Sequence, residues 1–192
     1  MRFSRTLGED LARDVGVSPN TSKHWVSLLA TSGLITVLEG WSRNATIRLV
    51  KAPKVYFNDT GLLCALLGFR NETALKESPL LGAVWETWGL SQIRIWLNNR
   101  GRLQQNLFYW RTKDGKEVDF VLEEDGILFG LECKATEPPG KDATTNLGLL
   151  RRSLEGAEVR SIVLCRVPEF VARWGHLDVS ADNGCHLDQV FV

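Results

Sequence analysis

The stretch from Lys116 to Ala135 constrains the fold more than any other part of the chain. It reads KEVDFVLEEDGILFGLECKA, two short apolar runs joined by Asp125-Gly126. An Asp-Gly pair between such runs is a strong indication of a β-hairpin with a two-residue turn. Glu124 then faces Ile127, and this pair fixes which residues oppose one another along both strands.

This register gives the hairpin one apolar face and one charged face. The apolar pairs are Leu122 with Phe129, Phe120 with Leu131, and Val118 with Cys133. On the other face Asp119 lies opposite Glu132, and Glu117 lies opposite Lys134. Two directly opposed carboxylates destabilise a strand pair, so a compensating positive charge is expected.

A divalent cation compensates such a pair best, and a lysine does so in part. Carboxylate oxygens favour Mg²⁺ or Mn²⁺ over zinc. Lys134, two residues after Glu132, would point the same way and could orient a water or stabilise charge on a phosphate. A solvent-facing sheet with ordinary surface charges is the alternative interpretation.

A third carboxylate, Glu86, lies in a long helix predicted over residues 80–99. One wide apolar face of this helix would carry Leu81, Val84, Trp85, Trp88, Ile95 and Trp96. Glu86 instead begins the stripe continued by Leu90, Ile93 and Leu97. A carboxylate in that position is costly to bury unless it is paired, so it needs a cation, a metal or a hydrogen-bond donor.

The N-terminal part predicts a helix-turn-helix followed by a hairpin, which together resemble a winged helix. A short helix with Leu11 and Val15 ends at Gly16. Ser18 or Asn20 would cap the next helix, whose apolar stripe is Trp25, Leu28 and Leu29 and which ends at Gly33. The hairpin would span residues 34–50, with Gly40 to Asn44 as its loop.

Polar residues on the second helix could contact nucleic acid, most simply DNA. They are Asn20, Thr21, Lys23 and His24, joined on or near the wing by Arg43 and Arg48. Residues 1–60 hold eight lysines and arginines against five acidic residues, within a chain of zero formal net charge. This mild excess fits nucleic-acid binding, but many winged helices only join domains.

The remaining pattern divides the chain into three parts. We expect a partial winged-helix domain over residues 1–56, a connecting helix and linker over 57–79, and an α/β domain with a mixed sheet over 80–192. The scattered cysteines and histidines predict neither a zinc site nor a disulfide framework. No signal peptide or membrane span is predicted, so a cytoplasmic protein is expected.

Several stretches resemble the C-terminal region of a group of prokaryotic AAA-type ATPases, a domain of unknown function with a PD-(D/E)XK nuclease-like core. They are SPNTSKHWVSLLATSGLI, KVYFNDTGLL, LGAVWETWGLSQI, YWRTKDGKEVDFVLE and LECKAT. The resemblance implies a restriction-endonuclease-like αβββαβ core behind the winged helix. It also implies that Glu86, Asp119 and Glu132 hold Mg²⁺ or Mn²⁺, and that Lys134 assists water attack on a phosphate.

Relatives in that group carry an upstream ATP-binding module, whereas this sequence has no G-x-x-x-x-G-K-[ST] motif and therefore no predicted ATP site. We therefore expect the nucleic-acid-binding C-terminal part of such an ATPase, with a nuclease-like metal site. A non-catalytic binding module and a structural scaffold, in which Lys134 neutralises the nearby acids, are the competing hypotheses. The sequence does not fix the oligomeric state.

Overall fold

A computed structural model describes residues 7–42, 52–102, 106–135, 142–154, 156–172 and 180–191. Its helices are α1 (Leu7–Val15), α2 (Pro19–Thr31), α4 (Thr60–Leu66), α5 (Glu72–Lys76), α6 (Leu81–Asn99), α7 (Asp142–Ser153) and α8 (Leu187–Val190). Its strands are β1 (Ile35–Leu38), β2 (Lys54–Phe57), β3 (Leu107–Arg111), β4 (Glu117–Glu124), β5 (Ile127–Cys133), β6 (Glu158–Leu164) and β7 (Ser180–Asp182).

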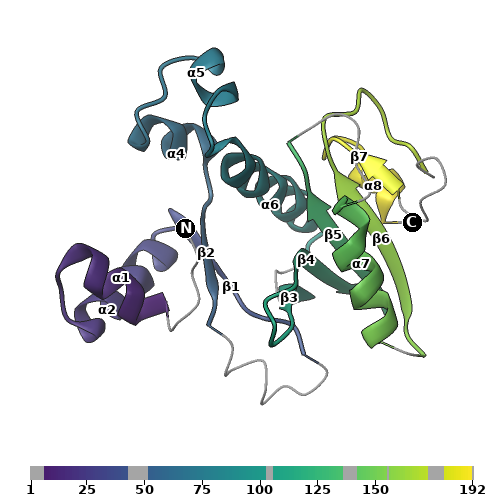
Figure 1. The fold of residues 1–192 in the computed structure, drawn as a ribbon, viewed down its shortest axis with the longest axis horizontal. Coiled ribbons are helices and arrows are strands. Elements are labelled where there is room, and N and C mark those ends of the chain that lie inside the picture. Colours follow the sequence, from purple (N-terminus) through teal and green to yellow (C-terminus); the bar gives the residue numbers. More distant parts are fainter. Residues whose placement is uncertain are drawn as a thin grey trace.

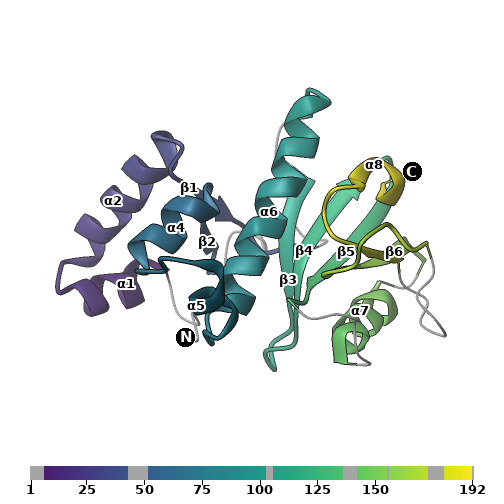
Figure 2. The ribbon, with the colours of Figure 1, turned by 90° about the horizontal axis from the view of Figure 1, so that it is seen from above.

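The C-terminal half is a mixed α/β layer built on a five-stranded sheet of order β3-β4-β5-β6-β7. Strands β3, β4 and β5 are antiparallel, and β5, β6 and β7 are parallel to one another. Helix α6 lies on one face of the sheet and α7 on the other (Figures 1 and 2). The order from α6 to β6 is as predicted, while β7 and α8 were not predicted.

Two apolar clusters fill the two sides of the sheet. On the α6 side, Leu90, Ile93 and Leu97 pack with Phe120 and other residues of the sheet. The stripe that begins at Glu86 is therefore the buried one. The wider predicted face is only partly covered: Val84 and Trp96 are buried, whereas the side chain of Ile95 is 52% exposed.

Helix α7 covers the opposite face through Leu147 and Leu150, which are buried against β4, β5 and β6. The close approach depends on Gly130 in β5. A Cβ atom at this position would lie 2.7 Å from a Leu150 methyl carbon and 3.2 Å from one of Leu147. A side chain here would push α7 away from the sheet.

The N-terminal half begins with the predicted helix-turn-helix. Gly16 ends α1 with a φ of 75°, and Ser18 is the N-cap of α2, its Oγ accepting a hydrogen bond from the Thr21 N–H at 3.1 Å. The predicted apolar stripe of α2 is at the surface, because α2 packs against the small elements α1 and β1 and buries Ser22 instead. The exposed side chains of this apolar stripe are Trp25, Leu28 and Leu29.

The two-stranded sheet differs from the predicted hairpin. Strand β1 pairs antiparallel with β2, from Ile35 opposite Phe57 to Leu38 opposite Lys54. The sequence predicted that the second strand of the hairpin would end at residue 50. Residues 43–51, which include Arg43 and Arg48, lie outside the described part of the chain. Strand β2 also extends one residue past the predicted domain boundary at residue 56.

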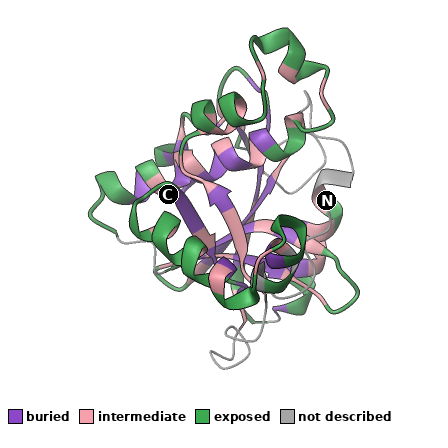
Figure 3. Ribbon diagram, turned by 90° about the vertical axis from the view of Figure 1, so that its left-hand side faces the viewer, coloured by how far each residue is buried: buried purple, intermediate pink, exposed green. Residues whose placement is uncertain are grey.

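Figure 3 shows that buried residues gather in the sheet and on the inner side of α6, whereas α4 and α5 are mostly exposed. Asp59 caps α4 by accepting a hydrogen bond from the Leu62 N–H at 2.5 Å. None of the helices in the described part of the chain is sufficiently long and apolar to cross a membrane.

Candidate functional site

The hairpin of β4 and β5 has the predicted turn and register near its tip. Glu124 pairs with Ile127, and the pairing continues to Phe120 with Leu131. Asp125 and Gly126 have φ values of 49° and 82°, the positive values that a type I′ turn requires. The apolar pattern was therefore sufficient to place this half of the hairpin.

The ladder stops where the charged residues begin. Across the other edge of β4, Phe108 pairs with Val121 while Trp110 pairs with Val118, so β4 contains one extra residue opposite β3. This β-bulge at Asp119 and Phe120 turns Val118 to the α7 side, although Phe120 lies on the α6 side. The predicted pairs beyond Phe120–Leu131 are therefore absent from the ladder.

The side chain of Asp119 accepts a hydrogen bond that a backbone carbonyl of β4 would accept in a regular strand pair. Its Oδ2 accepts a hydrogen bond from the backbone N–H of Cys133 at 2.8 Å, so the carboxylate lies at the gap between β4 and β5. Burial and the charges of Glu86 and Glu132 raise the pKa of Asp119 well above its usual value, while Lys54 and the Cys133 N–H oppose this shift. Asp119 is thus close enough to both other acids to interact with them.

Glu132 is buried, with only 4% of its surface exposed. Because side chains alternate along β5, it projects to the same side as Gly130, away from Leu131 and Cys133. Its Oε1 accepts a hydrogen bond from Nζ of Lys134 at 2.8 Å, whereas its Oε2 has no hydrogen-bond partner among the described residues. Burial raises the pKa of Glu132, although Lys134 lowers it in part.

Lys134 lies just beyond the end of β5. Its backbone N–H donates to the carbonyl oxygen of Leu164 at 2.9 Å, which aligns it with the end of β6. The side chain is 37% exposed and therefore reaches solvent as well as Glu132. Glu132 and Lys134, the predicted E-x-K residues, form an ion pair with each other.

Glu86 has the cation and donor that its position in the apolar stripe required. Its Oε1 accepts hydrogen bonds from Nζ of Lys54 at 2.8 Å and from the Tyr56 hydroxyl at 2.5 Å. Both partners come from β2, and the sequence interpretation missed them. A usable indication was present, because Lys54 and Tyr56 alternate with two apolar residues and must share one face of the strand.

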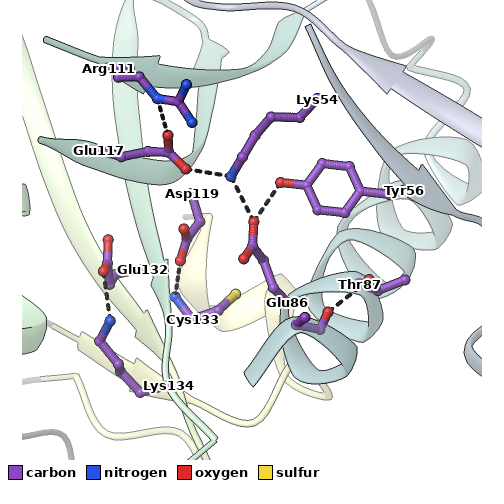
Figure 4. A network of polar contacts seen from close by, with 11 residues as sticks. Lys54, Tyr56, Glu86, Thr87, Arg111, Glu117, Asp119, Glu132, Cys133 and Lys134 are labelled. Carbon is purple, nitrogen blue, oxygen red and sulfur yellow. Dashed lines mark hydrogen bonds and ion pairs between the residues drawn. The ribbon is translucent and has the colours of Figure 1, made fainter. Parts of the chain in front are cut away.

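Lys54 also reaches Glu117, whose Oε1 lies 2.5 Å from the ammonium nitrogen. The second oxygen of Glu117 accepts a hydrogen bond from Nε of Arg111. Burial alone would lower the pKa of Lys54, but Glu86, Glu117 and Asp119 outweigh it and raise the pKa. Figure 4 shows the resulting row of contacts from Arg111 through Lys54 to Tyr56.

The three predicted metal ligands come from three elements, α6, β4 and β5. Glu86 belongs to the α6 side, Asp119 lies at the gap between strands, and Glu132 projects to the α7 side, with Asp119 drawn between the other two in Figure 4. The described part of the chain contains no set of three or more His, Cys, Asp or Glu side chains arranged to hold a metal ion. Each of the three acids places one oxygen in the hydrogen bonds described above. The other oxygen of each is the one that a cation could use.

The candidate nucleic-acid contacts on α2 are placed separately from this cluster. Asn20, Lys23 and His24 are exposed. Thr21 is half-buried, and its hydroxyl lies 2.8 Å from the Ser18 hydroxyl, so it serves the helix cap. Three of the four predicted residues of α2 are therefore exposed, whereas Thr21 serves the helix cap.

Two family profiles match the chain. One, described as a domain of unknown function (DUF8612), covers residues 6–73, and another, described as a domain of unknown function (DUF4143), covers residues 81–179. The chain belongs to the DUF4143 family. Glu86, Asp119, Glu132 and Lys134 all lie in the DUF4143 region, whereas Lys54 lies in the DUF8612 region.

Two mycobacterial proteins are similar to this DUF4143 chain. They are the uncharacterized protein Rv2008c of Mycobacterium tuberculosis and the uncharacterized protein Mb2031c of Mycobacterium bovis, each 34% identical over 152 residues. The similarity covers 77% of this chain but 33% of each relative, so the chain spans about a third of their length. No solved structure matches significantly.

Proposed function

We propose that the DUF4143 region hydrolyses phosphodiester bonds of nucleic acid with the help of Mg²⁺ or Mn²⁺ bound by Asp119 and Glu132. The observation that carries this proposal is the buried Glu132 carboxylate. One of its oxygens has no hydrogen-bond partner among the described residues, and the other is held by Lys134. A buried, unpartnered carboxylate oxygen is costly unless a cation or donor completes it.

The donor set fits a hard divalent cation. Asp119 and Glu132 offer carboxylate oxygens, and no thiol or imidazole is required. The cysteine nearest the acids, Cys133, has its thiol pKa raised by burial and by the acids around it, so it stays a neutral thiol. A bound Mg²⁺ or Mn²⁺ would stabilise the negative charge that develops on the phosphate during hydrolysis.

In this proposal Lys134 acts on the phosphate or on the attacking water. Burial alone would lower its pKa, but Glu132 raises it, so the ammonium remains charged and can donate hydrogen bonds at neutral pH. In the reaction a water oxygen forms a bond to phosphorus while the bond from phosphorus to a sugar oxygen breaks. The proton lost by the water passes to solvent, and the departing sugar oxygen takes up a proton from solvent.

The proposal predicts that Asp119→Asn and Glu132→Gln each weaken Mn²⁺ binding by about a hundredfold, because each removes one of the two negative charges that hold the cation. Isothermal titration of the purified chain measures the affinity, and cleavage of single- and double-stranded DNA and RNA measures activity. Asp114→Asn is the matched control, because Asp114 is an exposed aspartate in the preceding turn. Cleavage and Mn²⁺ binding that persist unchanged in both variants would refute the proposal.

We further propose that the DUF8612 region binds the nucleic acid and that an ATP-binding module acts with both regions in longer relatives. The support is the exposed polar face of α2, the resemblance to AAA-type ATPases, and the coverage of about a third of each relative. In this arrangement the winged-helix part would present nucleic acid, and the nuclease-like part would act on it.

A second candidate is a non-catalytic binding module. It is favoured by Lys54 and Lys134, whose ammonium groups already pair with Glu86, Glu117 and Glu132. This candidate predicts salt-sensitive DNA binding that Lys23→Glu weakens by roughly tenfold, since a phosphate contact becomes repulsive, while Asp119→Asn changes nothing. Fluorescence anisotropy at two salt concentrations measures both, and Mn²⁺-dependent cleavage by the parent chain would exclude this candidate.

A further inference from the structure

Lys54, together with Tyr56, joins the two halves of the chain at the acid cluster. It comes from β2, in the DUF8612 region, and its ammonium inserts among acids of the DUF4143 region. Its Nζ lies 2.8 Å from Oε1 of Glu86 and 2.5 Å from Oε1 of Glu117. Only 17% of the Lys54 side chain is exposed, so these ion pairs are shielded from solvent more than surface pairs are.

The surroundings of Lys54 hold it in this position from several sides. Its Nζ lies 5.6 Å from the centre of the Tyr56 ring and 5.7 Å from that of the Tyr109 ring, within the range of cation–π contact. The Tyr109 hydroxyl donates to the carbonyl oxygen of Ala52 at 2.6 Å, which ties down the chain just before β2. The lysine is therefore built into the cluster.

This arrangement bears directly on the ligands available to a cation. Glu86 uses Oε1 for both Lys54 and Tyr56, so this oxygen is held by β2. A divalent cation near Asp119 would also be repelled by the ammonium of Lys54, whose charge reaches Asp119. Lys54 thus opposes cation binding in two ways: it competes for Oε1 of Glu86, and it adds positive charge.

We propose that Lys54 is a gate on the cation site: while it is paired with Glu86 and Glu117, its charge weakens cation binding and it holds Oε1 of Glu86, and its withdrawal removes the repulsion and frees Glu86 to bind the cation with either oxygen. This inference rests on the proposed function of the cluster. Because Lys54 belongs to the β1–β2 sheet of the N-terminal half, a shift of that sheet would control the site. The half of the chain proposed to bind nucleic acid would thereby govern the half proposed to cleave it.

The test is a Mn²⁺ titration of four proteins: wild type, Lys54→Met, Glu86→Gln and the double variant. Methionine keeps the length of the lysine stem and removes its charge. The gate predicts that Lys54→Met binds Mn²⁺ at least about tenfold more tightly than wild type, since repulsion is removed and Oε1 of Glu86 is freed. Glu86→Gln alone is the reference for the double variant, which should lose much of this gain because Glu86 supplies part of it.

Tyr56→Phe gives a second variant that keeps the packing of the ring. It removes one donor from Glu86 and should strengthen Mn²⁺ binding in the same direction by roughly twofold to fivefold. Lys76→Met is the control, because Lys76 forms an ion pair with Glu72 on the exposed helix α5. Circular dichroism establishes that each variant is folded before titration.

The outcomes separate this inference from the function on which it rests. Saturable binding that appears or tightens in Lys54→Met, and depends on Glu86, supports the gate. Equal affinity in wild type and Lys54→Met, with binding still lost in Asp119→Asn, overturns the gate and leaves the proposed function standing. Absence of Mn²⁺ binding in every folded variant overturns both.

Discussion

Replacing Gly130 by valine is expected to lower the free energy of unfolding by about 3 kcal/mol, the upper end of the usual cost of overpacking a core. A Cβ atom alone would lie 2.7 Å from Leu150 and 3.2 Å from Leu147, and the valine methyl groups need further room. Both leucines are buried in α7 and cannot turn into solvent. Urea denaturation followed by circular dichroism measures the change.

Gly82→Ala is the matched control for this substitution. Nothing lies within 4 Å of a Cβ atom at Gly82, which is in the first turn of α6. Alanine favours a helix over glycine, so this variant should be more stable than wild type by about 0.5 kcal/mol. A Gly130→Val protein as stable as wild type would show that α7 does not pack on β5 as described.

Lys134→Met is expected to reduce the rate of Mn²⁺-dependent cleavage by about a hundredfold or more while Mn²⁺ still binds. The ammonium would contribute to the chemistry through the water or the phosphate and not by holding the cation. Its removal also takes a positive charge away from Glu132, which favours the binding of another cation. Single-turnover cleavage at saturating Mn²⁺ measures the rate, and titration measures the affinity.

Lys116→Met is the matched control for this variant, because Lys116 is an exposed lysine just before β4. It should cleave at the wild-type rate. If Lys134→Met cleaved equally fast, Lys134 would have no part in hydrolysis, and its ion pair with Glu132 would only be structural. If the variant instead lost Mn²⁺ binding, Lys134 would act by holding Glu132 in position.

The tip of the hairpin and the buried stripe of α6 were predictable because both depend on local patterns. The Asp-Gly pair fixed the turn between β4 and β5, and alternation then fixed the pairs as far as Phe120 and Leu131. The need of Glu86 for a cation followed from its place before Leu90, Ile93 and Leu97. These inferences require only neighbours three or four residues away along a helix, or two away along a strand.

The charged end of the hairpin was predicted less well because its geometry depends on distant strands. The bulge at Asp119 arises from the pairing of β4 with β3, and no feature of the hairpin itself specifies that register. The identity of the cation beside Glu86 likewise depends on how β2 packs against α6. Lys54 is 32 residues from Glu86 in the chain, so no local pattern connects them.

The exposed stripe of α2 shows a different limit of sequence reasoning. The spacing of Trp25, Leu28 and Leu29 correctly places them on one side of a helix, but spacing does not say what covers that side. In the structure these side chains are between 40% and 54% exposed. The amphipathic pattern therefore predicted the helix correctly but did not tell what covers its apolar side.

The most direct test is a crystal of the chain soaked in Mn²⁺ and measured at the manganese absorption edge. An anomalous peak within coordination distance of carboxylate oxygens of both Asp119 and Glu132 is the predicted result. In a well-ordered crystal at saturating Mn²⁺, the absence of any peak beside these two residues would contradict the assignment of a cation site and, with it, the proposed hydrolysis.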